Sequence, residues 1–96
     1  MRSTEDIKRG LQAIENRIDR DGEYMGDDPL AGLVMSIHQG QRAALQNVVQ
    51  SEHGEHWEMY DSLASALATD LGLAEYCQVQ AMINAHEWAQ GNRDSL

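Results

Sequence analysis

The residues best suited to chemistry lie in the stretch SEHGEHWEMYD, which contains His53 and His56. At 100° per residue, the two histidines share one side of a helix, and His86 falls on the inner side of a later helix. If these two helices form an antiparallel hairpin, the three imidazoles meet at one end of a bundle. Three neutral imidazoles, with a carboxylate such as Glu52 nearby, suit Zn²⁺ or another divalent transition metal.

The same histidines also fit a structural role, as half-buried groups at the end of the bundle near Trp57 and Trp88. Their spacing matches neither the HExxH of zinc hydrolases nor the Glu-x-x-His of di-iron bundles. Gly54 lies between them and weakens the helix that a rigid ligand pair requires. We therefore expect no resident metal or cofactor, and metal binding by His53, His56 and His86 is the alternative.

No other residues in the sequence form a recognisable catalytic pattern. No serine, cysteine or threonine has a base and an orienting partner at a recognisable spacing, and there is no glycine-rich phosphate loop. Cys77 is the single cysteine, so the chain cannot form an internal disulfide. We expect the protein not to be an enzyme.

Carboxylates recur every three residues through the same stretch and form a band on the outer side of the expected helix. No lysine or arginine lies near them in sequence, and like charges at this spacing destabilise a helix, which favours a functional explanation. Trp57 supplies an aromatic anchor beside the band. The predicted partner-binding residues are Glu52, Glu55, Trp57, Glu58, Asp61 and Asp70.

The net charge of -9 is distributed unevenly along the chain. Residues 1–42 hold six of the seven basic side chains and eight acidic ones, whereas residues 43–92 hold seven acidic side chains and no Lys or Arg. Such a half-chain repels nucleic acid and membrane phosphates and attracts basic protein surfaces. The expected partner is therefore a basic protein surface, in particular that of a nucleic-acid-binding protein.

Apolar periodicity and capping residues predict an all-α protein with a single domain over residues 1–96. Asp28 and Pro29 are a typical helix start, and Gly72 and Gly91 are typical helix ends. We expect a small bundle of about four helices, with the third and fourth as an antiparallel hairpin, although residues 29–71 could form one bent helix. The expected helices span about 4–21, 29–50, 52–71 and 74–90, with a polar tail over 91–96.

The first expected helix carries a narrow heptad-like seam of Ile7, Leu11, Ile14 and Ile18. A chain of 96 residues without phenylalanine has a small core, so a leftover apolar seam favours self-association. We expect a homo-oligomer held through this seam. A purely structural or assembly subunit is accordingly another alternative.

The N-terminal residues lack the apolar run of a signal peptide, and no segment approaches a membrane span of about 18 apolar residues. We therefore expect a cytoplasmic protein. The predicted function is that of a non-enzymatic binding module or inhibitor that presents its acidic helical face to a basic protein. In size, charge and class the chain is similar to small acidic inhibitors of nucleic-acid machinery, such as viral (phage) anti-defence proteins, anti-CRISPR proteins among them, and DNA mimics.

Overall fold

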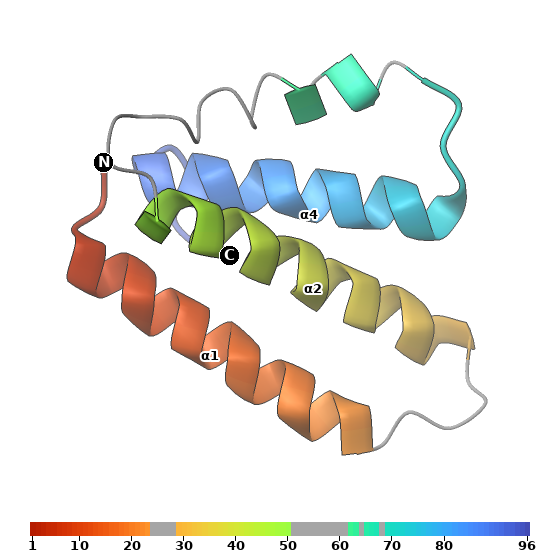
Figure 1. Cartoon of the computed structure of the whole chain (residues 1–96), viewed down its shortest axis with the longest axis horizontal. Coiled ribbons are helices and arrows are strands. Elements are labelled where there is room, and N and C mark those ends of the chain that lie inside the picture. The colour runs from red at the N-terminus through yellow and green to blue at the C-terminus, as the bar shows by residue number, and fades with distance from the viewer. Residues whose placement is uncertain (24–28, 51–61, 64, 68) are drawn as a thin grey trace.

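The computed structural model contains α-helices and no strand in the part of the chain that it describes, which confirms the predicted all-α class. Among the described helices, none combines the length and apolar character needed to cross a membrane. The helices are α1 (Thr4–Glu23), α2 (Pro29–Gln50) and α4 (Leu73–Gln90) (Figure 1). The described residues are 1–23, 29–50, 62–63, 65–67 and 69–96.

Capping residues set the ends of these helices. The Oγ of Ser3 accepts a hydrogen bond from the backbone N–H of Asp6 at 3.2 Å, which makes Ser3 the N-cap of α1. α2 spans Pro29–Gln50. α4 ends at Gln90 and is capped by Gly91, whose φ of 89° is the left-handed conformation that glycine adopts readily.

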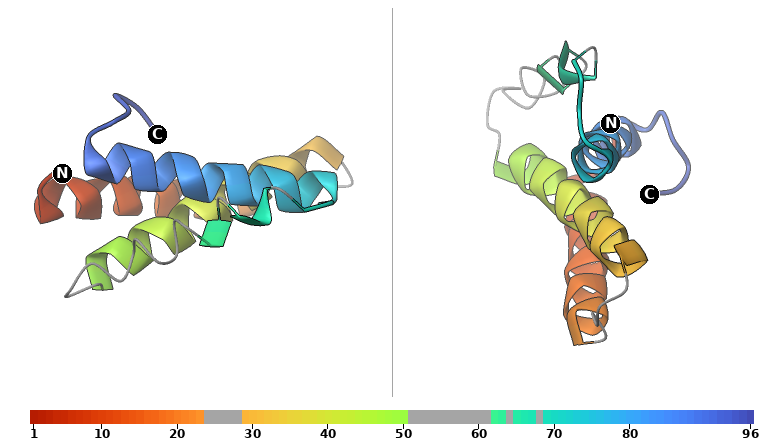
Figure 2. Two further views of the ribbon diagram at one scale, coloured as in Figure 1. Left: turned by 90° about the horizontal axis from the view of Figure 1, so that it is seen from above. Right: turned by 90° about the vertical axis from the view of Figure 1, so that its right-hand side faces the viewer.

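The three helices lie side by side with α2 between α1 and α4 (Figures 1 and 2). α1 runs antiparallel to α2, whereas α2 and α4 run in the same direction. The contacts agree with this parallel pairing, because Gly40 lies against Gln78 and Gln41 lines a pocket with Ala81. The first residues of α2 and α4 therefore lie at the same end of the molecule.

The predicted bundle of four helices is not confirmed. Most of the expected helix over residues 52–71 lies outside the described residues, and its pairing with α4 stays a prediction. Residues 62–63 and 65–66 are helical, but residues 69–72 are not, so the predicted end at Leu71 is too late. Gly72 does not close that helix and is instead the N-cap residue of α4, where its carbonyl accepts a hydrogen bond from the N–H of Tyr76 at 2.8 Å.

The core lies between the three helices, and small residues allow α2 and α4 to approach closely. The alanine-rich side of α4 faces α2, so Ala81, Ala85 and Ala89 are buried, whereas Tyr76 is exposed. A Cβ atom at Gly40 would lie 2.5 Å from the backbone oxygen of Gln78. The buried residues of the core cluster are Ile7, Ile14, Ala44, Leu45, Val48, Ala85, Trp88 and Ala89.

Arg2 joins the start of the chain to the C-terminal end of α4. Its backbone N–H donates to the carbonyl of Ala89 and its Nε to the carbonyl of Trp88, each at 2.8 Å. Its guanidinium lies 4.6 Å from the centre of the Trp88 ring, and its Nη2 donates to the carbonyl of Arg93 at 2.9 Å. These bonds satisfy helix-end carbonyls and add a cation–π contact.

Candidate functional site

Two acidic residues flank the start of α4. Asp70 and Glu75 are both exposed, and Asp70 is the one residue of the predicted partner-binding set that the structure describes. Glu75 lies in the first turn of α4, where a carboxylate interacts favourably with the helix dipole. The rest of the predicted set, Glu52, Glu55, Trp57, Glu58 and Asp61, lies outside the described residues.

Exposed apolar side chains accompany these acids at the same end of the molecule. Leu73 is 66% exposed and Tyr76 is 47% exposed, both at the start of α4. At the start of α2, Leu30 is 67% exposed, and Val34 is exposed as well. Large apolar side chains that gather on a surface mark interaction sites more often than isolated ones do.

Of the three predicted metal ligands, the structure describes His86 alone, because His53 and His56 lie outside the described residues. His86 is fully buried in α4, on the inner side where the sequence placed it. No group of three or more His, Cys, Asp or Glu side chains able to hold a metal ion occurs within the described ranges. The convergence of the three histidines stays a prediction.

The seam predicted as an oligomer contact lies inside the single chain. Ile7 and Ile14 are buried in the core, and Leu11 and Ile18 pack against it. The prediction assumed that these side chains stay uncovered, but α2 and α4 provide the apolar surface that covers them. A homo-oligomer would therefore have to form through another surface, because contact between chains through this seam would require the core to open.

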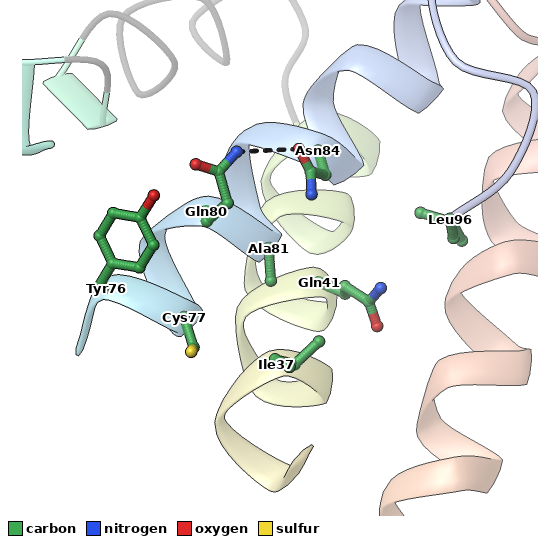
Figure 3. Close-up of a pocket in the computed structure, with 8 residues that line it drawn as sticks. All are labelled: Ile37, Gln41, Tyr76, Cys77, Gln80, Ala81, Asn84 and Leu96. Atoms are coloured by element: carbon green, nitrogen blue, oxygen red, sulfur yellow. Dashed lines mark hydrogen bonds between the residues drawn. The ribbon is translucent and has the colours of Figure 1, made fainter. Parts of the chain in front are cut away.

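A pocket of about 190 Å³ lies between α2 and α4. Figure 3 shows Ile37 and Gln41 extending from α2, with Leu96 of the C-terminal tail on the side nearest α1. The wall formed by α4 includes apolar, thiol and amide groups, and no lining side chain carries a formal charge. The residues of this wall are Tyr76, Cys77, Gln80, Ala81 and Asn84.

Three amide side chains line this pocket. The Nε2 of Gln80 donates a hydrogen bond to the Oδ1 of Asn84 at 3.1 Å, and the Nη1 of Arg93 reaches the same oxygen at 3.4 Å. Gln41 is only 8% exposed, and its Oε1 accepts no hydrogen bond from the described residues. A buried amide oxygen without a donor is costly, so Gln41 destabilises this part of the α2–α4 contact.

A second polar cluster joins the end of α1 to α2. The Nε2 of His38 lies 2.9 Å from the Oδ2 of Asp21, and the Nε of Arg20 donates to the Oδ1 of Asp21 at 3.0 Å. The hydrogen bond from Arg20, followed by that with His38, lowers the pKa of Asp21 below its ordinary value. The cluster therefore holds Asp21 as a carboxylate and ties two helices together.

Sequence reasoning missed both the pocket and this cluster. Gln41 carried the one available signal for the pocket, because it interrupts the apolar face of α2 between Ile37 and Leu45. His38 and Asp21 lie 17 residues apart and share no motif. Comparison of the chain with protein-family models, with curated proteins and with solved structures finds no match.

Proposed function

We propose that this protein is a non-enzymatic binding module, or an inhibitor, that presents an acidic surface to a basic protein. The observation that carries this proposal is the charge distribution: residues 43–92 contain seven acidic side chains and no Lys or Arg. Asp70 and Glu75, both exposed, are the described members of this run nearest the start of α4. Carboxylates without neighbouring cations attract a positively charged surface.

The surroundings of these acids support binding to a protein. Leu73 and Tyr76 are exposed beside them, and protein interfaces combine aromatic and apolar side chains at their centre with a charged rim. The predicted helix, shortened to end before residue 69, would add the acidic band of residues 52–61 to the same surface. The interface would then extend from the start of α4 along that helix.

The class of partner follows from the sign of the charge. Proteins that bind nucleic acid carry lysine and arginine side chains that neutralise phosphates, and an acidic surface competes for these side chains. The protein would then inhibit its partner by covering the nucleic-acid site, as a DNA mimic does. The similarity in size and charge to phage anti-defence inhibitors supports the same class of action.

The test compares two charge-reversing double variants that each change the net charge from -9 to -5. Asp70→Lys with Glu75→Lys alters the proposed surface, whereas Asp19→Lys with Asp94→Lys alters exposed carboxylates elsewhere. Partners captured from lysate are identified by mass spectrometry, purified and measured by surface plasmon resonance at several salt concentrations. The first pair should slow association by about tenfold or more, and the wild-type association rate should fall as salt increases.

The control pair distinguishes an effect of the acidic surface at the start of α4 from an effect of the net charge of the whole protein. Equal losses for the two pairs would mean that long-range charge, and not the start of α4, guides the partner. A captured partner without a basic surface, or an association rate independent of salt, would contradict the proposal itself. Circular dichroism of all the variants confirms that the helices are retained.

A further inference from the structure

We propose that the exposed apolar side chains at the starts of α2 and α4 bind an amphipathic helix of the partner, one whose apolar stripe is flanked by lysine or arginine. This inference rests on the proposed function, because it takes the basic protein proposed above as the partner. It adds the kind of element through which that protein binds, and it extends the interface from α4 onto α2. The apolar docking surface consists of Leu30, Val34, Leu73 and Tyr76.

The docking surface holds most of the large apolar side chains that are exposed in the described part of the chain. Leu30 is 67% exposed and Leu73 is 66% exposed, and the values for Val34 and Tyr76 are 41% and 47%. Among the described residues, the one further exposed side chain of this kind is Met1. Apolar side chains that gather in this way mark an interaction site.

The parallel pairing of α2 and α4 brings these side chains together. Ile37 of α2 and Tyr76 of α4 line the same pocket between the helices (Figure 3). Val34 lies one turn before Ile37, and Leu30 lies one turn before Val34. Leu73 likewise lies one turn before Tyr76, and residues three or four positions apart share one face of a helix. The docking surface is therefore continuous and leads into the pocket.

The register of the helices explains why the start of α2 is exposed. Gly40 lies against Gln78, and both helices rise equally per residue, so α4 begins level with about residue 35 of α2. On the other side, Asp21 pairs with His38, and the antiparallel α1 ends two residues after Asp21. α2 therefore projects beyond both of its neighbours at its start.

The charges near the docking surface select a basic occupant. Asp70 and Glu75 are exposed and flank the start of α4. In the sequence, Asp27 and Asp28 directly precede Pro29, the first residue of α2. Lysine and arginine side chains beside an apolar stripe are attracted to these carboxylates. A second copy of the chain is disfavoured, because each copy carries a net charge of -9.

Two arginines limit where the basic side chains of the partner can lie. The Nε of Arg20, in the last turn of α1, already donates to Asp21. The Nη1 of Arg93 lies 3.4 Å from the Oδ1 of Asn84, which lines the pocket two turns beyond Tyr76. The basic side chains therefore fit beside the starts of α2 and α4, and the pocket is suited to an uncharged side chain.

The pocket extends the docking surface inwards and can hold one anchor of the partner. Its volume of about 190 Å³ exceeds that of an apolar cavity of about 150 Å³ that accepts benzene, so a leucine or phenylalanine side chain fits. Ile37 and Ala81 supply apolar walls. A helix that docks through one face presents anchors at spacings of three, four and seven residues. The anchor at one end of the stripe would then enter the pocket.

A designed peptide tests the docking surface directly. The probe is a helical peptide of about 14 residues with leucines on one face and lysines on the other. Titration into the ¹⁵N-labelled full chain should give saturable shifts of the backbone amides of Val34, Leu73 and Cys77, with a Kd on the order of 10 µM. Two control peptides, one with its leucines spread around the helix and one with glutamate in place of lysine, should bind at least about tenfold more weakly. Equal binding of the three peptides would overturn the proposal.

Two double variants separate this inference from the proposed function. Leu30→Ser with Leu73→Ser leaves the charge unchanged and should weaken binding of the leucine–lysine peptide by about tenfold or more. Ala13→Ser, at an exposed position of α1, is the control and should bind the peptide as wild type does. Circular dichroism checks that the helices are retained.

The charge-reversing pair Asp70→Lys with Glu75→Lys completes the comparison. If it weakens binding of the peptide while the serine pair binds as wild type does, the acidic surface is supported and the apolar docking surface is wrong. If neither pair weakens binding, neither surface guides a basic helix.

A measurement on the unmodified chain is independent of the folding of any variant. Cys77 is the single cysteine of the chain, is partly buried and lines the pocket. The leucine–lysine peptide at saturation should slow alkylation of Cys77 by iodoacetamide by about threefold or more, and the leucine–glutamate peptide at the same concentration should not. An unchanged alkylation rate with the leucine–lysine peptide would overturn the proposal.

Discussion

Gly40 of α2 lies directly against the backbone carbonyl of Gln78 in α4. A Cβ atom at position 40 would approach that oxygen to 2.5 Å, closer than a carbon atom can lie without movement of the backbone. The absence of a side chain at this position therefore sets the distance between the two parallel helices. Gly32, two turns earlier in α2, has no atom within 4 Å of its corresponding position.

This difference predicts opposite effects for the same substitution at two sites in one helix. Gly40→Ala should lower the free energy of unfolding by about 1–3 kcal/mol, because α4 must move away. Gly32→Ala should raise it by about 0.5–1 kcal/mol, because alanine favours the helix and has space there. Urea unfolding followed by circular dichroism measures both. Equal effects of the two alanines would contradict the close contact.

The carboxylate of Asp21 should make stability dependent on pH. Because its pKa is lowered in the folded state, its contribution is complete above the usual carboxyl pKa of about 3.9 and is lost as the pH falls below that value. Asp21→Asn should remove the contribution, so the stability of the variant should fall less between pH 5 and about pH 3. Melting temperatures measured across this range test the effect. The neighbouring exposed Asp19→Asn is the control, and an identical response of the two variants would exclude a special role for Asp21.

The contacts of Arg2 predict a measurable contribution to stability. Arg2→Gln should lower the free energy of unfolding by about 1–2 kcal/mol, because it removes the cation–π contact with Trp88 and a hydrogen bond to a helix-end carbonyl. In a Trp57→Phe background, iodide should also quench Trp88 fluorescence more strongly in the variant.

Arg9→Gln provides a control for the loss of a positive charge at the same end of the chain. Arg9 pairs with Asp6 on the surface, where both side chains are exposed, and such pairs contribute little. The control should change the free energy of unfolding by less than about 0.5 kcal/mol. A similarly small effect of Arg2→Gln would mean that its contacts do not stabilise the fold.

Because Ile14 is buried, we expect Ile14→Glu to unfold the protein. If the seam were a contact between chains, the same substitution would separate the chains and leave each one folded. Ile14 is fully buried, and an unpaired carboxylate in its place should cost several kcal/mol, on the order of 3–5. Leu30→Glu, at an exposed position, should leave the helices intact. Circular dichroism and light scattering distinguish the outcomes. A well-folded Ile14→Glu protein with a lower mass than wild type would restore the seam as a contact between chains.

The local structure of α1 and α2 could be predicted because strong signals mark these helices. Ser3 caps α1, Pro29 begins α2, and branched apolar side chains recur at helical spacing in both. The face of α4 was harder to predict. Its buried side includes Ala81, Ala85 and Ala89, which are weakly apolar, whereas the larger Tyr76 lies exposed.

The candidate sites depend on contacts between distant parts of the chain, which explains why sequence patterns indicated so little of them. The pocket requires α2 and α4 to be parallel, and no local signal distinguishes that direction from the antiparallel one. The pairing of Asp21 with His38 likewise depends on how α1 meets α2. The sequence shows that Asp70 belongs to an acidic run. The exposure of the Asp70 side chain near the start of α4 follows from the fold.

The bonds of Arg2 to the end of α4 also determine when the fold can be completed during synthesis. Arg2 and the Trp88 carbonyl that it binds are 86 residues apart, and contacts of such long range form slowly. A nascent chain leaves the ribosome from its N-terminus, so Ile7 and Ile14 emerge long before Trp88 and Ala89, which share their core cluster. Until Trp88 and Ala89 have emerged, these two isoleucines lack part of their apolar cover, so this core closes only after α4 has been made.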